Sequence, residues 1–294
     1  MIKVSIIIVN YNTKELLDNC IESVYEKCTS KNFEIIVVDN NSFDDSCNMI
    51  TEKYKNVILI KNKVNYGFGK ANNIGVKVAK GEFVLFLNSD TIVQNNIVDE
   101  FIKYYEDNEL KGNIGCLGAW LFDNENNVVS SAGSFPNGKR IIKEYINIIR
   151  KSNKNNNVDR NKNTSLSITD VDYVVGALMF LKRDLFISLD GFDEKFFMYF
   201  EETDLQFRLK EVGLRRVLIT EPKVIHLEGK SPNRSNTKRI IYTQSMYSYF
   251  KKIYGNIKYY VFKILTLFLR LPAFLRREYS FKENISFFYN VIRG

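Results

Sequence analysis

The sequence predicts an α/β fold of the doubly wound, Rossmann-like kind, with a mostly parallel sheet flanked by helices and a C-terminal helical extension. Four short apolar runs are continuous rather than alternating, as expected for strands buried on both faces of a parallel sheet. These runs are Val4–Val9, Glu34–Val38, Val57–Lys61 and Glu82–Leu87. The helical patterns between them are Lys14–Lys27, Asp44–Tyr54 and Phe68–Lys80. Such strand–helix alternation is typical of this fold class.

The pattern changes after Thr91 but continues to alternate between helix and strand. The expected elements are a helix at Ile97–Asp107, a strand-rich stretch at Gly115–Ser131, a strand at Asp172–Lys182, helices at Arg183–Leu189 and Glu201–Val212, and strands at Val217–Ile219 and Lys223–His226. Lys151–Thr169 is rich in Asn, Ser and Lys and is predicted to be a flexible loop. A loop of this length is either an acceptor-side lid or a tolerated surface insertion.

Charge is distributed unevenly along the 294 residues. The chain through Gly229 holds 29 basic and 32 acidic residues, whereas Lys230–Gly294 holds 13 basic and 2 acidic ones. The basic tail therefore suggests a polyanion or an anionic membrane surface as its partner, although a solvated basic helix would look the same. The four cysteines form no CxxC pair and stand far from the single histidine, which favours a reducing compartment and argues against zinc.

Polar residues follow three of the predicted strands. They are Asn10-Tyr11-Asn12, Asp39-Asn40-Asn41 and Asn88-Ser89-Asp90. Ligands of such sheets bind beyond the carboxyl ends of the strands. Asp90 is a hard oxygen ligand suited to Mg²⁺ or Mn²⁺, and Asp39 can accept hydrogen bonds from a base or ribose. Each tripeptide also has turn-forming chemistry, so each alone can simply begin the next helix.

Glu201, Glu202 and Asp204 crowd the start of a predicted helix. Clustered carboxylates raise one another's pKa, which suits a general base. The same residues also complement the positive end of the helix dipole without any catalytic role. His226, the only histidine, follows a short strand, and a single histidine by itself is more often structural than a ligand.

Taken together, these segments resemble glycosyltransferase family 2, in its rhamnosyltransferase-like branch, which has the GT-A fold. The matching segments are VSIIIVNYNTKELLDNCIESV, EIIVVDNNSFDDS, NYGFGKANNIGVKVAKGEFVLFLNSDT, VGALMFLKRDLFISLDGFDEKFFMYFEETDLQFRLKEVG and VIHLEGKS. They cover roughly residues 3–231. The resemblance implies a catalytic domain over 1–230, with a donor-binding half of about 1–110 and an acceptor half of about 111–230, and a separate tail over 231–294.

The resemblance also implies roles for individual residues. The residues expected to bind the nucleotide and donor are Val9, Asn10, Tyr11, Asp39, Asn65, Gly67, Phe68, Asn72, Asn73 and Ser89. Asp90 resembles the last position of a DxD-type metal motif whose first position here is Asn88, and His226 resembles a histidine that completes the metal shell. The implied cofactor is Mn²⁺ or Mg²⁺.

Glu202 aligns with the catalytic base of the family, with Glu201 and Asp204 as substitutes and Arg208 as the residue that orients the acids. The implied reaction is a single displacement with inversion. Glu202 takes a proton from the acceptor hydroxyl, which attacks the anomeric carbon opposite the leaving diphosphate. The expected donor is a nucleoside-diphosphate sugar, carrying rhamnose or another hexose. The expected acceptor is a cell-surface polysaccharide or a lipid-linked glycan.

The tail over 231–294 alternates aromatic residues, leucines and Lys/Arg with helical spacing over Ile240–Gly294. No stretch of 18 uncharged apolar residues occurs, so we expect the tail to lie in a membrane interface rather than to span it. A helix pair packed on the catalytic domain or on a second subunit, as in a homodimer, is the alternative. The expected location is cytoplasmic, peripheral at the inner face of the membrane.

Two other classes remain as alternatives. A nucleotidyltransferase would need a basic, Gly-rich triphosphate loop, which NYNTKELL at Asn10–Leu17 does not provide. An inactive GT-A-like protein that only binds nucleotide sugars would be expected to lack Asp90, Glu202 or His226, and all three are present. No nucleic-acid partner is expected, because the sequence has neither an RNP-type aromatic motif nor a helix-turn-helix pattern.

Overall fold

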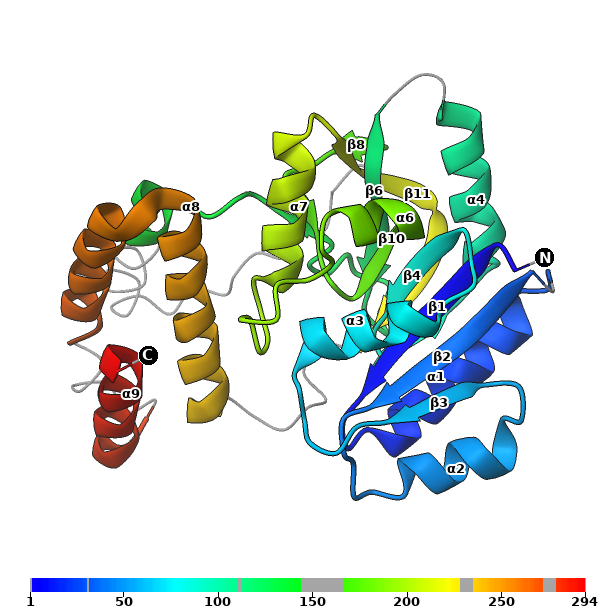
Figure 1. Cartoon of the computed structure of the whole chain (residues 1–294), viewed down its shortest axis with the longest axis horizontal. Helices are drawn as coiled ribbons and strands as arrows, with labels where there is room; N and C mark the ends of the chain where they lie inside the picture. The colour runs from blue at the N-terminus through cyan, green and yellow to red at the C-terminus, as the bar shows by residue number, and fades with distance from the viewer. Residues whose placement is uncertain are drawn as a thin grey trace. The chain divides into compact units, whose positions relative to one another are not determined.

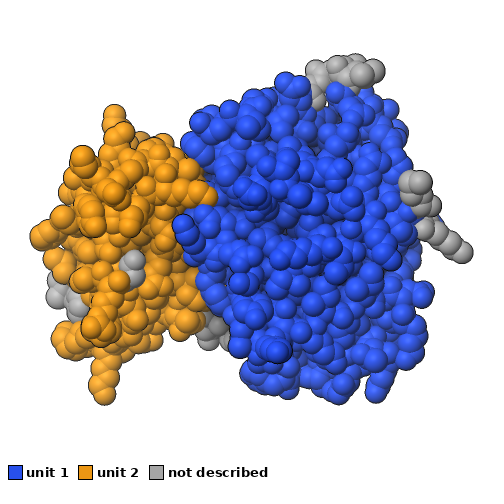
Figure 2. Space-filling model, in the orientation of Figure 1, with its two compact units in different colours: residues 1–134, 162–197, 201–230 blue, residues 135–161, 198–200, 231–294 orange. Residues whose placement is uncertain are grey.

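The computed structural model describes residues 2–30, 32–109, 113–143, 166–227, 235–271 and 279–293. The chain divides into two compact units (Figure 2). Unit 1 comprises Met1–Ser134, Lys162–Phe197 and Glu201–Lys230, and unit 2 comprises Phe135–Asn161, Met198–Phe200 and Ser231–Gly294. The predicted domain boundary at residue 230 stays a prediction.

Unit 1 is built on one mixed sheet (Figure 1). Its strands run in the order β3 (Ile58–Lys61), β2 (Phe33–Asp39), β1 (Val4–Asn10), β4 (Phe83–Leu87), β10 (Leu178–Lys182), β6 (Ile114–Phe122), β11 (Arg215–His226) and β5 (Thr91–Val93). The first four are parallel to one another, and β10 is antiparallel to both of its neighbours. A two-residue strand β8 (Thr169–Asp170) pairs with β11, while β7 (Ala132–Gly133) and β9 (Tyr173–Val174) form a separate pair.

Helices cover both faces of the sheet. The helices α1 (Lys14–Lys27), α2 (Ser46–Lys53) and α4 (Ile97–Asn108) pack on one face, and α3 (Phe68–Val78), α6 (Arg183–Ser188) and α7 (Glu201–Glu211) pack on the other. Alternate residues of β1 serve the two faces, since Ile6 and Ile8 join the first core cluster and Ile7 joins the second. This two-sided burial explains why the strand sequences are continuously apolar, and the predicted α/β class is confirmed.

Two predicted elements differ from the structure. The predicted strand at Asp172–Lys182 is interrupted between β9 and β10, where the Ala177 carbonyl instead accepts a hydrogen bond from Asn88 N at 3.0 Å. The two short strands predicted after Val217 are one strand, β11, whose register shifts between Ile219 and Val224. Pro222 lies inside that irregular stretch and has no N–H to donate to a neighbouring strand. Residues 151–165 of the predicted loop lie outside the described residues.

Unit 2 is helical where it is described. Helix α8 (Asn236–Arg270) is interrupted at Gly255, which has φ 79° and ψ 171°, and helix α9 (Phe281–Arg293) packs against α8. Arg239 joins the two helices, because its guanidinium lies 3.8 Å from the Phe287 ring centre and donates to Asn284 Oδ1 at 3.0 Å. Within the described ranges, no helix offers a stretch both long enough and apolar enough to cross a bilayer.

Candidate active site

The ends of three parallel strands are joined by side-chain hydrogen bonds. Asn10, at the end of β1, lies beside Asp39 of β2 and donates from Nδ2 to Asp39 Oδ2 at 2.7 Å. Its Oδ1 accepts from Thr13 Oγ1 at 2.7 Å, and Thr13 Oγ1 lies 3.0 Å from Ser89 Oγ, which follows β4. The polar residues that the sequence analysis picked out at three strand ends therefore lie at one edge of the sheet.

Exposure separates the residues of this edge that a ligand can reach from those that organise it. Tyr11 is 46 % exposed, whereas Asp39 is 1 % exposed and already accepts hydrogen bonds from Asn10 and from Ser42 N at 2.9 Å. Val9 is half-buried in β1. Tyr11 thus offers an aromatic face at the surface, and Asp39 fixes the two loops around it.

The loop before α3 is closed by a backbone contact that only glycine permits. Gly67 has φ +81°, and a Cβ at this position would lie 1.9 Å from Phe197 O. The next residue, Phe68, donates its N–H to the same carbonyl at 2.9 Å, and Asn65 Oδ1 accepts from Gly67 N at 2.9 Å. The loop is therefore pinned to the segment that precedes α7 in the sequence.

Asn40 is a site residue that the sequence analysis did not select. It is 2 % exposed, its Nδ2 donates to Gly67 O at 3.0 Å, and its Oδ1 accepts from Asn62 Nδ2 at 2.9 Å. It therefore ties the end of β2 to the loop before α3. The available signal is a second polar residue directly after a strand-ending aspartate, a pattern that turn formation alone also explains.

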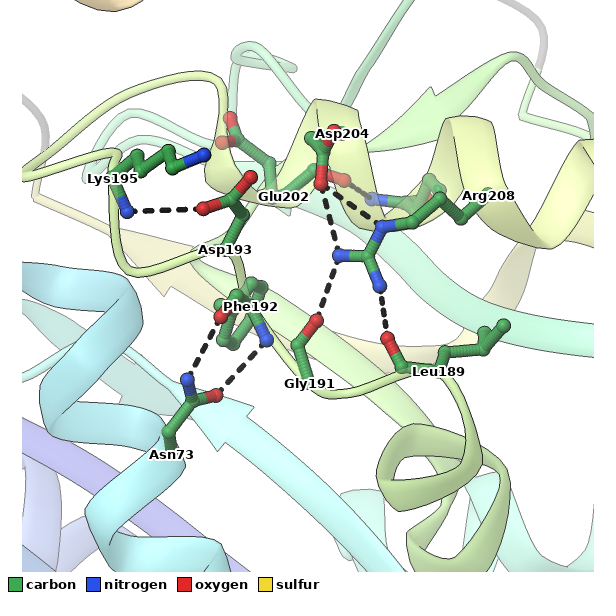
Figure 3. A network of polar contacts seen from close by, with 10 residues as sticks. Asn73, Leu189, Gly191, Phe192, Asp193, Lys195, Glu202, Asp204 and Arg208 are labelled. Atoms are coloured by element: carbon green, nitrogen blue, oxygen red, sulfur yellow. Dashed lines mark hydrogen bonds and ion pairs between the residues drawn. The ribbon is translucent and has the colours of Figure 1, made fainter. Parts of the chain in front are cut away.

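Two neighbouring asparagines of α3 have different surroundings. Asn73 uses both ends of its amide on the backbone of Phe192, at 2.8 and 2.9 Å, as Figure 3 shows. Asn72 is 1 % exposed and donates to Phe68 O at 3.1 Å, but its Oδ1 has no hydrogen-bond partner among the described residues. Of the two, Asn72 keeps a buried acceptor without a partner among the described residues, and Asn73 holds the loop that precedes α7.

Asp90 and His226 are brought together by β5, a strand that the sequence analysis did not predict. Thr91 at the start of β5 pairs with His226 of β11, and Leu227 N donates to Asp90 O at 2.9 Å. His226 Nε2 lies 3.3 Å from Asp90 Oδ1, and the two side chains are 11 % and 26 % exposed. Two residues separated by more than a hundred positions in the sequence thus share one site.

The three acids at the start of α7 have different environments. Asp204 is fully buried and is held by Arg208, whose Nε and Nη2 lie 3.0 and 2.9 Å from Asp204 Oδ2 (Figure 3). Arg208 also donates to the carbonyls of Leu189 and Gly191. Burial, together with the negative charge of Glu202, raises the pKa of Glu201 well above its usual range. Glu202 is half-buried, so it is the most accessible of the three acids.

Close packing connects these acids to the edge of the sheet. A Cβ at Gly176 would lie 3.7 Å from Glu202 Cβ, and the next residue, Ala177, accepts the hydrogen bond from Asn88 N. A Cβ at Gly69 in α3 would lie 3.3 Å from Glu201 Cβ. The start of α7 therefore packs beside α3. Gly176 and Ala177 also connect it to the segment that carries Asp90.

Two residues with left-handed backbone precede α7. Tyr199 has φ 69° and Phe200 has φ 71°, conformations that cost non-glycine residues about 1–3 kcal/mol each. Within unit 2, Met198 O accepts from Ser245 Oγ at 2.8 Å, and the Phe200 ring lies 5.6 Å from the Tyr249 ring. These contacts hold the strained pair within unit 2, and no pattern of residues predicts its backbone conformation.

The residues around Asp90 suit a hard divalent cation. Asp90 supplies a carboxylate and His226 an imidazole, and their facing atoms are 3.3 Å apart. Within the described part of the chain, no group of three or more His, Cys, Asp or Glu side chains is placed so that it could hold a metal ion. An ion at Asp90 and His226 would therefore need further ligands from a bound substrate. Mg²⁺ and Mn²⁺ are commonly held by one or two carboxylates plus substrate phosphates, so this donor set fits such an ion when a diphosphate is also bound.

Comparison with known proteins identifies the family. The model of glycosyl transferase family 2 matches residues 5–132. The rhamnosyltransferase WbbL of Escherichia coli K12 is 30 % identical over 234 residues, covering 76 % of this chain and 83 % of that protein. The poly(ribitol-phosphate) β-glucosyltransferase of Bacillus spizizenii is 33 % identical over 120 residues, which are 39 % of this chain and 19 % of that much longer relative.

Solved structures have the same fold. TarS residues 1–349 from S. aureus superposes with a TM-score of 0.60 at 18 % identity, covering 99 % of this chain and 79 % of that chain. The same protein with UDP-GlcNAc bound has a TM-score of 0.59 at 19 % identity, covering 98 % and 79 %. The chain belongs to glycosyl transferase family 2, which confirms the predicted family, the GT-A fold and the enzyme class.

Proposed function

We propose that this protein transfers a sugar, with inversion, from a nucleoside-diphosphate sugar to a cell-surface polysaccharide or lipid-linked acceptor. The observation that carries the proposal is the position of Glu202. It is the most accessible acid at the start of α7, and it packs against Gly176. The residue after Gly176, Ala177, accepts a hydrogen bond from Asn88 N, two positions before Asp90. A proton acceptor and a diphosphate-binding aspartate are the two groups that a single displacement requires.

The donor is a nucleotide sugar in this proposal. S. aureus TarS has been solved with UDP and with UDP-GlcNAc, and E. coli WbbL is named a rhamnosyltransferase. In this chain, Tyr11 offers an exposed ring at the strand edge, and Asn72 keeps a buried acceptor without a partner among the described residues. These groups suit a nucleotide base and a sugar hydroxyl, respectively.

In the reaction, Glu202 accepts the proton of the acceptor hydroxyl as that oxygen attacks the anomeric carbon. Glu201 keeps its proton to higher pH than an exposed glutamate, because burial and the charge of Glu202 raise its pKa. Asp204 is committed to Arg208, so it positions the helix rather than accepting the proton. Asp90 and His226 would hold Mn²⁺ or Mg²⁺, and such an ion supplies positive charge beside the leaving diphosphate.

The acceptor and the tail belong to the same proposal. One relative, WfaP of E. coli, is named for a GlcNAc-diphosphoundecaprenol acceptor and is 38 % identical over 104 residues, 35 % of this chain. The basic tail, with 13 basic and 2 acidic residues from Lys230 onward, suits an anionic membrane surface where such an acceptor would lie. We therefore place the enzyme at the periphery of a membrane.

A donor panel tests the proposal. With Mn²⁺ or Mg²⁺ present, the protein should slowly hydrolyse one nucleotide sugar among uridine- and deoxythymidine-diphosphate sugars, measured as released nucleoside diphosphate. Asp90→Asn should weaken metal-dependent donor binding at least tenfold. Asp107→Asn, an exposed aspartate on α4, is the matched control and should bind like the wild type.

The panel also separates the alternatives. Donor binding without hydrolysis or transfer for any sugar would favour an inactive nucleotide-sugar-binding protein. Release of pyrophosphate from a nucleoside triphosphate and a sugar phosphate would favour a nucleotidyltransferase. Equal metal-dependent affinity for wild type and Asp90→Asn would reject Asp90 as a metal ligand.

A further inference from the structure

The second half of α8 exposes a continuous apolar face. Its residues recur at spacings of three and four, so they lie on one side of the helix. They are Ile257, Tyr260, Val261, Ile264, Leu265 and Phe268, which together form the apolar stripe. Ile257 is 83 % exposed and Phe268 is 67 % exposed, while Tyr259, Phe262 and Thr266 on the opposite side are buried. Exposed apolar surface of this extent usually marks a binding site for another molecule.

A pocket lies along one edge of this stripe. It has a volume of about 530 Å³, which is in the range of sites for small organic ligands. Ile257, Val261 and Leu265 of the stripe line it together with Gly138 and Ile142. The rings of Phe250 and Phe262, which also line the pocket, stack with centres 3.9 Å apart, so part of the wall is a rigid aromatic surface.

Two lysines complete the lining of the pocket. Lys139 and Lys258 are both exposed at their positions, and neither α8 nor the segment 135–143 contains an acidic residue. An apolar pocket with cationic groups at its edge matches a molecule that joins an apolar chain to an anionic headgroup. A second copy that paired this pocket with its own is a poor occupant, because it would bring the same lysines against each other.

We propose that this pocket binds the apolar chain of a single-chain lipid phosphate from the membrane, with Lys139 and Lys258 contacting its phosphate or diphosphate. The proposal rests on the proposed function, because it specifies the lipid-linked class of acceptor. The stripe beside the pocket would lie in the bilayer interface, and one lipid chain would leave the bilayer to fill the pocket.

Two variants with matched exposure test the pocket. Val261 is 54 % exposed and lines the pocket, whereas Ile264 is 55 % exposed on the same stripe and is not among the lining residues. With the full-length protein and farnesyl phosphate as the probe, Val261→Trp should weaken binding at least tenfold, and Ile264→Trp should leave it within twofold of wild type. Equal binding by Val261→Trp and wild type would overturn the proposal.

The contributions of charge and chain are tested with simpler probes. Farnesol, which lacks the phosphate, and inorganic phosphate, which lacks the chain, should each bind at least tenfold more weakly than farnesyl phosphate. Lys139→Gln combined with Lys258→Gln should remove the advantage of farnesyl phosphate over farnesol, while Lys282→Gln on α9 should keep it. Inorganic phosphate competing as well as farnesyl phosphate would show an anion site without a chain site and reject the proposal.

Photolabelling keeps the test decisive if a variant fails to fold. A diazirine-bearing prenyl phosphate should label the wild-type protein within residues 138–142, 250–254 or 257–265, and labelling elsewhere would contradict the proposal. Donor hydrolysis in Val261→Trp should equal that of wild type. Loss of lipid binding with hydrolysis retained concerns the pocket alone, whereas absence of hydrolysis in the wild-type protein concerns the proposed function.

Discussion

The strand edge of unit 1 and the α8 surface of unit 2 differ in which side chains they bury and which they expose. Unit 1 buries polar side chains at its strand edge and pairs them, as with Asn10, Asp39 and Asn40, each at most 2 % exposed. Unit 2 exposes large apolar side chains, as with Ile257 at 83 % and Phe281 at 68 %. Buried, paired polar groups give a preorganised site, whereas exposed apolar groups favour the binding of a partner.

The difference assigns separate tasks to the two units. Chemistry on a charged donor needs groups that are already oriented, because reorganising them during the reaction would raise the barrier. Binding to an apolar surface needs only a matching face, because the hydrophobic effect has no preferred direction. Changes in unit 1 should therefore alter catalysis and backbone geometry sharply, and changes on the surface of unit 2 should alter binding to lipid.

The largest expected effect is on catalysis, from Glu202→Gln. Loss of a general base typically lowers the rate about 10²–10⁴-fold, and donor affinity should stay within a few-fold because the amide is nearly isosteric. The measurement is the transfer rate with the donor chosen by the panel, alongside donor binding. Glu211→Gln, an exposed glutamate on the same helix, is the control and should transfer at the wild-type rate.

A retained rate in Glu202→Gln would break the comparison, because the reaction would then depend on a group outside this cluster of acids. A parallel fall in Glu211→Gln would point to damage of α7 as a whole instead. The combination of a large loss of transfer with retained donor binding is the result that supports a base.

The donor half was readable from sequence because its strands are buried on both faces. Continuous apolar runs and strand-end polar residues predicted β1, β2 and β4, and α1 begins and ends at the predicted residues. Local pattern sufficed for these elements because each follows the simple strand–helix alternation of the fold. The proximity of Asp90 and His226, at 3.3 Å, was implied only by the family resemblance.

Other parts of the site could not be read in this way because they depend on contacts between distant segments. The three-residue strand β5 is too short to show a period, yet it pairs His226 with the residue after Asp90. The left-handed backbone of Tyr199 and Phe200 has no sequence signal, since neither residue type favours it. Asn73 was predicted to lie near the donor, and its pairing with Phe192, 119 residues away, needed the fold.

The next effect is on stability and contrasts glycines of the two units. Gly67, Gly213 and Gly255 all have positive φ, but only at Gly67 would a Cβ meet another atom, at 1.9 Å from Phe197 O. Gly213→Ala and Gly255→Ala should each cost about 1–3 kcal/mol of unfolding free energy, the cost of holding a non-glycine residue in a sparsely populated backbone region. Gly67→Ala should cost more and should also weaken donor binding, as measured by urea unfolding and donor titration.

Equal losses for all three glycine variants would show that backbone angle alone matters and that the loop before α3 tolerates displacement from Phe197. A loss of donor affinity in Gly255→Ala comparable to that in Gly67→Ala would contradict the separation of tasks between the units. The two controls share the positive φ of Gly67, so the comparison isolates the close approach of the loop to Phe197.

The smallest effect concerns the pH dependence of stability through Glu201. Its pKa is raised in the folded protein by burial and then by Glu202, so folding favours the protonated acid. Wild-type stability should therefore fall as pH rises from the ordinary glutamate pKa, about 4.3, toward the raised value in the folded state. Glu201→Gln removes this loss, so its stability relative to wild type should increase as pH rises above the ordinary glutamate pKa. Because the amide also changes the buried contacts, the slope of unfolding free energy against pH is the quantity to compare, with Glu211→Gln expected to keep the wild-type slope. Parallel slopes for wild type and Glu201→Gln would mean that Glu201 is ionised as easily in the folded as in the unfolded chain, and the buried acid would then be no different from an exposed one.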